Sequence, residues 1–456
     1  MRVWIDATRQ DEGLEIFGMS LLERLLRSLL QAQRQVDGLK DLEGNLPRLT
    51  EAAVFVRSFI ENRLHPTEIL IELRPNATAP THLPPDLLAK LPIVFSQGEA
   101  STCQRLAEAA RKADGQPLLA LSADTVVDVR VLEHLIWANR PLALISGSGD
   151  ERAAAMRIDK PLPETITGHE DLPALAEACL EQGVCEQWSR DEFESYVKKL
   201  RRTVDAHLFR ITNQEAATKV ARFLFSSNYK GATDFLTKYV YPPLVWRAVV
   251  PLAKRQVQPN TVTAVGIACC VASIPFCAMG WWIPGLFLAY AMSFLDSVDG
   301  KLARLTFTSS RQGDVLDHGT DIVHPPLWYF AWAWGLSGGV ASSAVFQASV
   351  WLAGLYIADR ILEKLFKACT GGRSVQDYKP LDVRLRTFVS RRNVNLALFS
   401  LSLPLGLGVE AFYAILVLQA ATVAYHLARV VQCWNTGEQD ARRVSAPAGT
   451  RGDSRS

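Results

Sequence analysis

Residues 293–321 read SFLDSVDGKLARLTFTSSRQGDVLDHGTD and contain five aspartates, four of which form two pairs at helical spacing. Asp296 and Asp299 are three residues apart, and Asp317 and Asp321 are four apart, so each pair projects from one face of a helix. Long apolar runs flank this stretch, and an unpaired carboxylate near hydrocarbon is costly. Four converging carboxylates therefore require a compensating cation.

The chemistry of these carboxylates indicates a divalent metal. Hard oxygen ligands favour Mg²⁺ or Mn²⁺, and both ions usually keep coordination places for substrate phosphates. The alternative is pairing with nearby arginines, for which Arg304, Arg311 and Arg360 are available. That alternative explains any single aspartate equally well. All four in this spacing, with Gly300 and Gly313, favour a metal site for pyrophosphate chemistry.

The second half of the chain predicts an all-α membrane domain. About 20 apolar residues cross a bilayer, and the apolar segments lie at approximately 260–281, 283–304, 315–336, 340–360, 392–408 and 411–430. The connections alternate between nearly uncharged and strongly basic, so the positive-inside rule places the basic loops and both termini in the cytosol. We therefore expect six transmembrane helices in a multi-pass protein of the inner, cytoplasmic membrane.

The first half predicts a soluble α/β domain. RVWIDA, EILIELRP, PLLALSADTVVD and PLALISG read as buried strands that alternate with helices, which favours a mostly parallel sheet covered on both faces. Ligands of such sheets bind at the carboxyl ends of the strands, where Asp124 lies. The amino terminus lacks the pattern of a secretory signal, so we expect this domain to stay in the cytosol.

Charge and cysteine content narrow the classes of function. A formal net charge of +2, with basic residues at the ends of apolar segments, gives no argument for a nucleic-acid partner. Eight scattered cysteines, with no CxxC pair, argue against a zinc site or a disulfide framework.

Residues 226–256 are rich in aromatic and cationic side chains. This segment is predicted to lie along the bilayer surface, with an ordinary packed amphipathic helix as the alternative.

The acidic stretch has the pattern DxxDGxxAR, eight residues, then GxxxDxxxD. This pattern resembles the signature of the CDP-alcohol phosphotransferase (CDP-alcohol phosphatidyltransferase) family. The resemblance implies that Asp296, Asp299 and Asp317 ligate a two-metal centre. It also implies that Asp321 contacts metal and is the catalytic base that deprotonates the acceptor hydroxyl.

The same resemblance implies where the donor nucleotide binds. Residues 259–263, PNTVT, resemble the PNxxT opening of the family's first span. The implied nucleotide-binding residues come from this opening, from the acidic stretch and from the basic loop that follows it, and they are Asn260, Thr263, Gly300, Ala303, Arg304 and Ser310.

Three arginines resemble the positions at which family members that use inositol phosphate bind the acceptor phosphate. They are Arg360, at the end of the predicted fourth span, and Arg391 and Arg392, at the start of the fifth. Cations at cytosolic helix ends are also expected from topology alone, so this interpretation stays open.

The first half resembles sugar-nucleotide transferases of the GT-A-type nucleotidyltransferase fold, in which an aspartate such as Asp124 helps to hold metal. These enzymes carry a glycine-rich loop after the first strand, whereas residues 6–9 here read DATR. We therefore expect a degenerate nucleotidyltransferase-like domain.

The order of the two domains resembles that of bifunctional inositol-phosphate cytidylyltransferase / di-inositol-phosphate phosphate synthase proteins. The predicted boundaries are 1–225, 226–256, 257–434 and a disordered tail at 435–456.

The leading hypothesis is a transferase that moves a phosphoalcohol unit from a CDP-activated donor to a hydroxyl acceptor, with release of CMP, in phospholipid or polar-lipid biosynthesis. Inositol phosphate, glycerol phosphate or another alcohol is the expected acceptor. Two alternatives are an enzyme whose first domain also makes the CDP-alcohol, and a membrane cation carrier, because intramembrane carboxylates also mark ion pathways. A homodimer is left open.

Overall fold

The computed structural model describes the chain except residues 12, 44–65, 81, 167, 189–195, 198–199, 201, 230–232, 371, 377 and 446–456. The chain divides into two compact units. The first unit comprises Met1–Val197, Thr203–Asn228 and Leu305–Phe307, and the second comprises Lys198–Arg202, Tyr229–Arg304 and Thr308–Ser456.

A seven-stranded sheet forms the centre of the first unit, with the strand order β10-β8-β9-β6-β1-β4-β5. The neighbours pair in parallel except β9, which is antiparallel to both β6 and β8. The expected α/β sheet is therefore confirmed as a mixed sheet. Its strands are β1 (Arg2–Asp6), β4 (Glu68–Leu73), β5 (Ile93–Gln97), β6 (Leu118–Ser122), β8 (Leu142–Ser146), β9 (Ala153–Ile158) and β10 (Glu186–Gln187).

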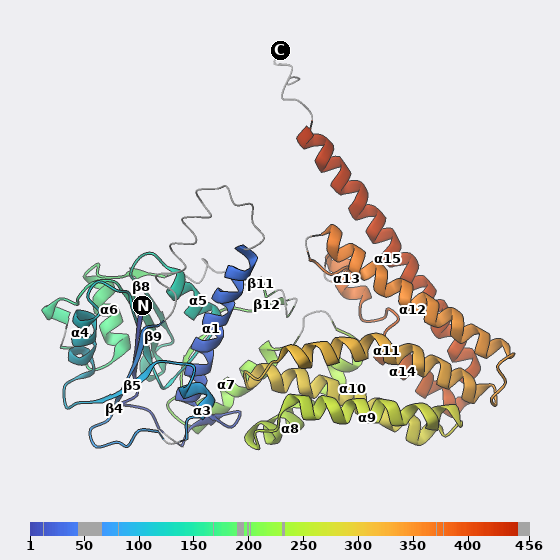
Figure 1. Ribbon diagram of the computed structural model, residues 1–456, viewed down its shortest axis with the longest axis horizontal. Coiled ribbons are helices and arrows are strands. Elements are labelled where there is room, and N and C mark those ends of the chain that lie inside the picture. The colour runs from blue at the N-terminus through green and yellow to red at the C-terminus, as the bar shows by residue number, and fades with distance from the viewer. Residues whose placement is uncertain are drawn as a thin grey trace, which may run out of the picture. The chain divides into compact units, whose positions relative to one another are not determined.

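Helices cover both faces of this sheet (Figure 1). Alternation along β1 explains the two layers, because Val3 and Ile5 join one apolar cluster while Trp4 joins the other. The first cluster contains residues of α1 (Leu21–Glu43), α3 (Pro85–Leu88) and α5 (Val129–Trp137), and the second contains residues of α4 (Thr102–Lys112) and α6 (Leu172–Glu181).

Short strands and one further helix complete the first unit. Two of them matter below, because β13 (Leu208–Arg210) pairs antiparallel with β7 (Thr125–Val127) and so brings Arg210 beside Thr125. The others are β2 (Glu15–Ile16), β3 (Met19–Ser20), β11 (Tyr196–Val197), β12 (Arg202–Thr203) and α7 (Gln214–Ser227).

The second unit is helical within its described residues. A π-helical turn, Leu236–Val240, leads into the first long helix. The helices are α8 (Tyr241–Lys254), α9 (Pro259–Ala278), α10 (Trp282–Leu305), α11 (Arg311–Leu336), α12 (Ala344–Cys369), α13 (Pro380–Leu385), α14 (Arg392–Ser402) and α15 (Gly408–Ser445). The backbone of α15 continues past the predicted boundary at 435, and the rest of the predicted tail, 446–456, lies outside the described residues.

Three of these helices are long and apolar enough to cross a membrane: Pro259–Ala278, Ala344–Cys369 and Gly408–Asn435. The predicted second and third spans correspond to α10 and α11, which carry the aspartates and are therefore less apolar. The predicted fifth span corresponds to α14, which ends at Ser402 before a 3₁₀ turn containing Pro404. The count of six transmembrane helices stays a prediction.

Close packing between α11 and the end of α9 gives a test of the helical unit. A Cβ at Gly335 would lie 2.2 Å from the carbonyl oxygen of Cys277, whereas a Cβ at Gly354 would meet nothing within 4 Å. We expect Gly335→Ala to lower the free energy of unfolding by about 1–3 kcal/mol, because backbone cannot move aside cheaply. Gly354→Ala is the matched control and should be neutral or slightly stabilising. Thermal unfolding of the detergent-solubilised protein measures both, and equal melting temperatures would contradict this packing.

Candidate active site

Two helices bring the first acidic pair and the PNTVT opening together. Pro259 starts α9, and four residues later the hydroxyl of Thr263 donates a hydrogen bond to Oδ2 of Asp299 on α10, at 2.5 Å. Asp299 is only 6 % exposed, so this bond satisfies an oxygen that water reaches poorly. The opening that resembles a nucleotide contact thus also fixes an aspartate of the motif.

A single guanidinium links the two halves of the acidic motif. Arg392, at the start of α14, donates from Nη2 to Oδ2 of Asp296 on α10 at 2.6 Å and from Nη1 to Oδ1 of Asp321 on α11 at 2.8 Å. The side chain of Asp321 is 52 % exposed, whereas that of Arg392 is 15 % exposed. Carboxylates from two helices therefore converge on one position that accepts positive charge.

This arrangement fits a divalent cation. One guanidinium carries a single positive charge, whereas Asp296, Asp299 and Asp321 supply three carboxylates to the same region. The fourth predicted ligand, Asp317, lies on α11 one turn before Asp321, and its side chain lies outside the described residues. Carboxylate oxygens are the donor set that magnesium and manganese prefer.

The predicted nucleotide contacts meet at the start of α11. The hydroxyl of Ser310 caps this helix by accepting a hydrogen bond from the amide of Gly313 at 3.0 Å. A Cβ at Gly313 would lie 2.8 Å from Oδ1 of Asn260 and 3.2 Å from the Ser310 hydroxyl. Three motif positions from α9 and α11 are thus neighbours, and only glycine fits between the two side chains.

The other predicted nucleotide contacts lie on the last turns of α10. A Cβ at Gly300 would come within 3.4 Å of the Arg304 guanidinium, so the absent side chain lets that guanidinium lie along the helix. Ala303 precedes Arg304, and its carbonyl accepts the amide of Thr308 at 3.0 Å where α10 ends.

Two of the predicted acceptor arginines lie in a second, buried charge cluster. Arg360 on α12 pairs with Asp359 at 2.5 Å and with Glu363 at 2.9 Å, and Arg391 pairs with Glu363 at 3.0 Å. His426 on α15 contacts Asp359 at 2.5 Å. The third arginine, Arg392, contacts the acidic motif instead.

The sequence-based prediction missed Glu363, His426 and Tyr356. Asp359, Glu363 and His426 present ligand atoms within 4.8 Å of one another, a spacing that could hold a metal ion, although arginines already pair with both carboxylates. The hydroxyl of Tyr356 donates to the backbone carbonyl of Asp321 at 2.6 Å and so connects α12 to α11. Charged residues within apolar helices were the available signal for Glu363 and His426.

The aspartate predicted in the first unit, Asp124, lies two residues after the end of β6 and is buried. Its Oδ1 accepts the Ser122 hydroxyl at 2.6 Å, and its Oδ2 accepts Nε of Arg210 at 2.8 Å. A metal at Asp124 would have to replace this arginine, and the metal-binding role of Asp124 stays a prediction.

Comparison with known proteins decides the nature of the helical unit. Residues 256–434 match the CDP-alcohol phosphatidyltransferase family along their whole length. This part of the chain belongs to that family. The CDP-alcohol phosphatidyltransferase domain therefore contains α9 to α14, most of α15 and the described acidic residues. The family consists of membrane-associated transferases of substituted phosphate groups.

Two curated relatives share parts of this chain. An uncharacterised class-I CDP-alcohol phosphatidyltransferase family protein of Schizosaccharomyces pombe is 31 % identical over 115 residues, which cover 21 % of this chain and 29 % of the relative. The inner membrane protein YnjF of Escherichia coli is 36 % identical over 72 residues, which cover 15 % of this chain and 35 % of YnjF. The matched region is thus about a third of each relative or less.

The hydrogen bond between Thr263 and Asp299 gives a test of the site's geometry. Thr263→Val keeps the shape but removes the donor from a buried carboxylate, so the transferase domain should lose about 1–3 kcal/mol of unfolding free energy. Thr263→Ser retains a hydroxyl and should restore most of that loss. Chemical unfolding of the three proteins in detergent measures the effect, and equal stability of the valine and serine variants would contradict the bond.

Proposed function

We propose that this protein transfers a substituted phosphate from a CDP-activated lipid or alcohol to a hydroxyl acceptor and releases CMP. The observation that carries the proposal is the convergence of Asp296 and Asp321 on one cation, with Asp299 held beside them, in a domain of this family. The side chain of Asp321 is exposed to solvent, so a substrate that arrives with metal and phosphate could reach these carboxylates.

In this proposal the residues that hold two Mg²⁺ or Mn²⁺ ions are Asp296, Asp299, Asp317 and Asp321. Bound there, the ions supply positive charge that neutralises the diphosphate of the donor and the charge that develops on departing CMP. The protein would contribute the geometry: Thr263 orients Asp299, and Asp317 precedes Asp321 by four residues on α11.

The nucleotide part of the donor would lie between the starts of α9 and α11 and the end of α10. Asn260 and Ser310 already lie on either side of Gly313, and Arg304 is the nearest cation for the phosphates on α10. The proposed nucleotide-binding set is Asn260, Thr263, Gly300, Ala303, Arg304 and Ser310.

The transfer itself needs one base. The acceptor hydroxyl oxygen forms a bond to the phosphorus that carries the donor's alcohol, the bond between this phosphorus and the CMP oxygen breaks, and the hydroxyl proton passes to the carboxylate of Asp321. Asp321 is the most exposed described member of the motif, so an acceptor can reach it from solvent. Arg392 hydrogen-bonds to Asp321 and would hold its carboxylate in position for this role.

The acceptor's own phosphate, in this proposal, binds Arg360, Arg391 and Arg392. Arg360 and Arg391 share Glu363, Arg360 also pairs with Asp359, and an acceptor phosphate would compete with these carboxylates. Tyr356 connects the helix of Arg360 to the backbone of Asp321. Inositol phosphate and glycerol phosphate are acceptors with the required chemistry, because each offers a hydroxyl and a phosphate dianion.

We also propose the setting of the reaction. The domain would span the inner membrane six times with both termini in the cytosol, in phospholipid or polar-lipid biosynthesis. The exposed Phe235, Tyr239 and Leu244 around the start of α8 would meet the lipid surface.

We also propose that the first unit is a degenerate GT-A-type nucleotidyltransferase domain. The parallel strands around β1 and the position of Asp124 at the end of β6 support this, and the glycine-free residues 6–9 support its degeneracy.

Replacement of the proposed base tests the function. Asp321→Asn keeps size and polarity but cannot accept the proton, so CMP release from a CDP-activated lipid should fall by roughly 10²–10⁴-fold. Glu410→Gln, an exposed carboxylate at the start of α15, is the control and should retain wild-type rates. The measurement is CMP formed by the purified protein in detergent with Mg²⁺ or Mn²⁺. Absence of CMP release from the wild type, together with ion flux in vesicles, would instead support a cation carrier.

Separate replacement of an acceptor arginine tests the proposed phosphate site. Arg391→Gln should raise KM for a phosphate-bearing acceptor by roughly tenfold or more, because a charge-assisted hydrogen bond is lost, and should leave KM for the CDP-donor nearly unchanged. Arg384→Gln, exposed on α13, is the control. Initial rates with each substrate varied in turn distinguish the two effects, and an equal rise in both KM values would refute the assignment.

A further inference from the structure

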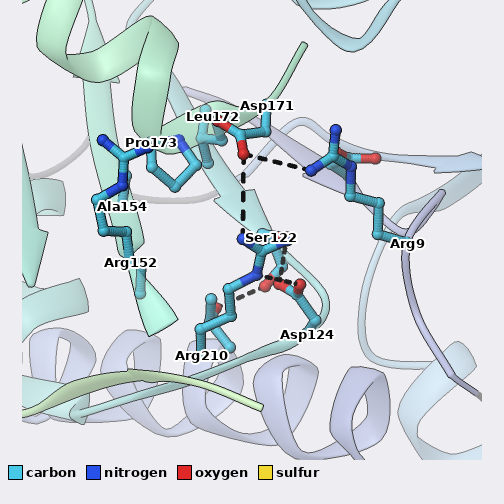
Figure 2. Close-up of a pocket in the computed structure, with 12 residues that line it drawn as sticks. Arg9, Ser122, Asp124, Arg152, Ala154, Asp171, Leu172, Pro173 and Arg210 are labelled. Carbon is cyan, nitrogen blue, oxygen red and sulfur yellow. Dashed lines mark hydrogen bonds and ion pairs between the residues drawn. The ribbon is translucent and has the colours of Figure 1, made fainter. Parts of the chain in front are cut away.

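A small pocket at one edge of the central sheet has no part in the proposed transfer (Figure 2). It lies where β1 and β6 end, which is also where antiparallel β9 begins. Figure 2 shows Arg9, Arg152 and Arg210 approaching the pocket from different sides, with Asp171 between Arg9 and Arg210. Ligands of sheets of this kind bind at this edge.

The deeper carboxylates of this pocket already have partners. Oδ1 of Asp6 accepts the amide and the hydroxyl of Thr8 at 3.0 and 2.6 Å, and its Oδ2 accepts the Thr102 hydroxyl at 3.3 Å. Asp124 accepts Nε of Arg210 at 2.8 Å, so its charge is neutralised. A divalent cation would have to break these contacts before it could bind either carboxylate.

The arginines keep donors for a ligand. A guanidinium has five N–H groups, and within the described part of the chain Arg210 hydrogen-bonds through Nε alone, with Nη1 4.0 Å from Oδ2 of Asp171. Arg9 reaches the same Oδ2 from Nη1 at 3.2 Å, donates from Nη2 to the carbonyl of Glu170 at 3.1 Å, and is 40 % exposed. Arg152 reaches Glu177 at 2.8 Å. Oδ2 of Asp171 is thus shared by two arginines, with Arg9 at 3.2 Å and Arg210 at 4.0 Å.

We propose that this pocket is a metal-independent binding site for a small phosphate monoester. The phosphate would take the place of Oδ2 of Asp171 between Arg9 and Arg210, because three acceptor oxygens and about two negative charges satisfy two guanidinium groups better than one carboxylate oxygen does. Asp171 also caps α6 through Oδ1, so its carboxylate would have to turn away from the two arginines to admit the phosphate.

The chemistry of the pocket favours a monoester over a nucleoside triphosphate. A triphosphate needs close approach of backbone amides and a metal, whereas residues 6–9 contain no glycine and Arg210 already pairs with Asp124. Arg210, which neutralises Asp124, would thus take the place of a metal ion, and the site would recognise a phosphate group without a metal. This inference is independent of the reaction proposed for the transferase domain.

Isothermal titration of the full-length protein in detergent micelles with EDTA tests the site. The probes are glycerol 3-phosphate, inorganic phosphate and CTP. Arg9→Gln is the diagnostic variant because Arg9 is exposed, and Arg140→Gln is its control, since Arg140 is 47 % exposed and pairs with Glu186 in the same unit. Arg391→Gln in both backgrounds weakens binding at the transferase domain's arginines, so the difference between the two backgrounds reports on the pocket.

We expect glycerol 3-phosphate to bind without metal, and Arg9→Gln to weaken it by roughly tenfold or more relative to Arg140→Gln. Equal binding of inorganic phosphate would support the same site and show that the phosphate group alone is recognised. No binding of either probe, or equal affinities of the Arg9 and Arg140 variants, would overturn the proposal. Binding of CTP only with Mg²⁺, lost in Asp124→Asn, would overturn it in favour of a metal-nucleotide site.

Discussion

The contact on which the site depends is the guanidinium of Arg392 between Asp296 and Asp321. Carboxylates on neighbouring helices repel each other, and in surroundings of low dielectric that repulsion is strong. A cation between them lets α10, α11 and α14 approach. The side-chain amide of Asn393, the next residue, donates hydrogen bonds to the carboxylate of Asp234 at 3.1 Å. These bonds fix the start of α14 and so help to position Arg392 between the two aspartates.

Charge balance distinguishes the two units. In the first unit, Asp124 meets Arg210 and the pair is complete. In the transferase domain, Arg392 contacts the carboxylates of both Asp296 and Asp321, and buried Asp299 lies on the same helix as Asp296. A buried carboxylate needs a cation nearby. In the first unit Arg210 supplies this cation to Asp124, whereas in the transferase domain we propose that divalent metal ions add to the charge of Arg392.

Local patterns of sequence predicted the parts of the site that lie on single helices. The spacing of the aspartates and the position of Pro259 indicated α9, α10 and α11, and the alternation of strands with helices indicated the sheet. Contacts between distant residues were not predictable: Arg392 lies 71 residues from Asp321, and nothing near either residue indicates the pair. Likewise, the reversed direction of β9 and the early end of α14 depend on tertiary pairing and on Pro404.

The central claim is that the acidic motif holds divalent cations. Electron paramagnetic resonance of Mn²⁺ added to the full-length protein in detergent tests it without any turnover. The account predicts bound Mn²⁺ with the magnetic coupling of two neighbouring ions, and loss of that signal in Asp296→Asn but not in Glu410→Gln. Spectra of free Mn²⁺ alone, or the same bound signal in Asp296→Asn, would contradict it.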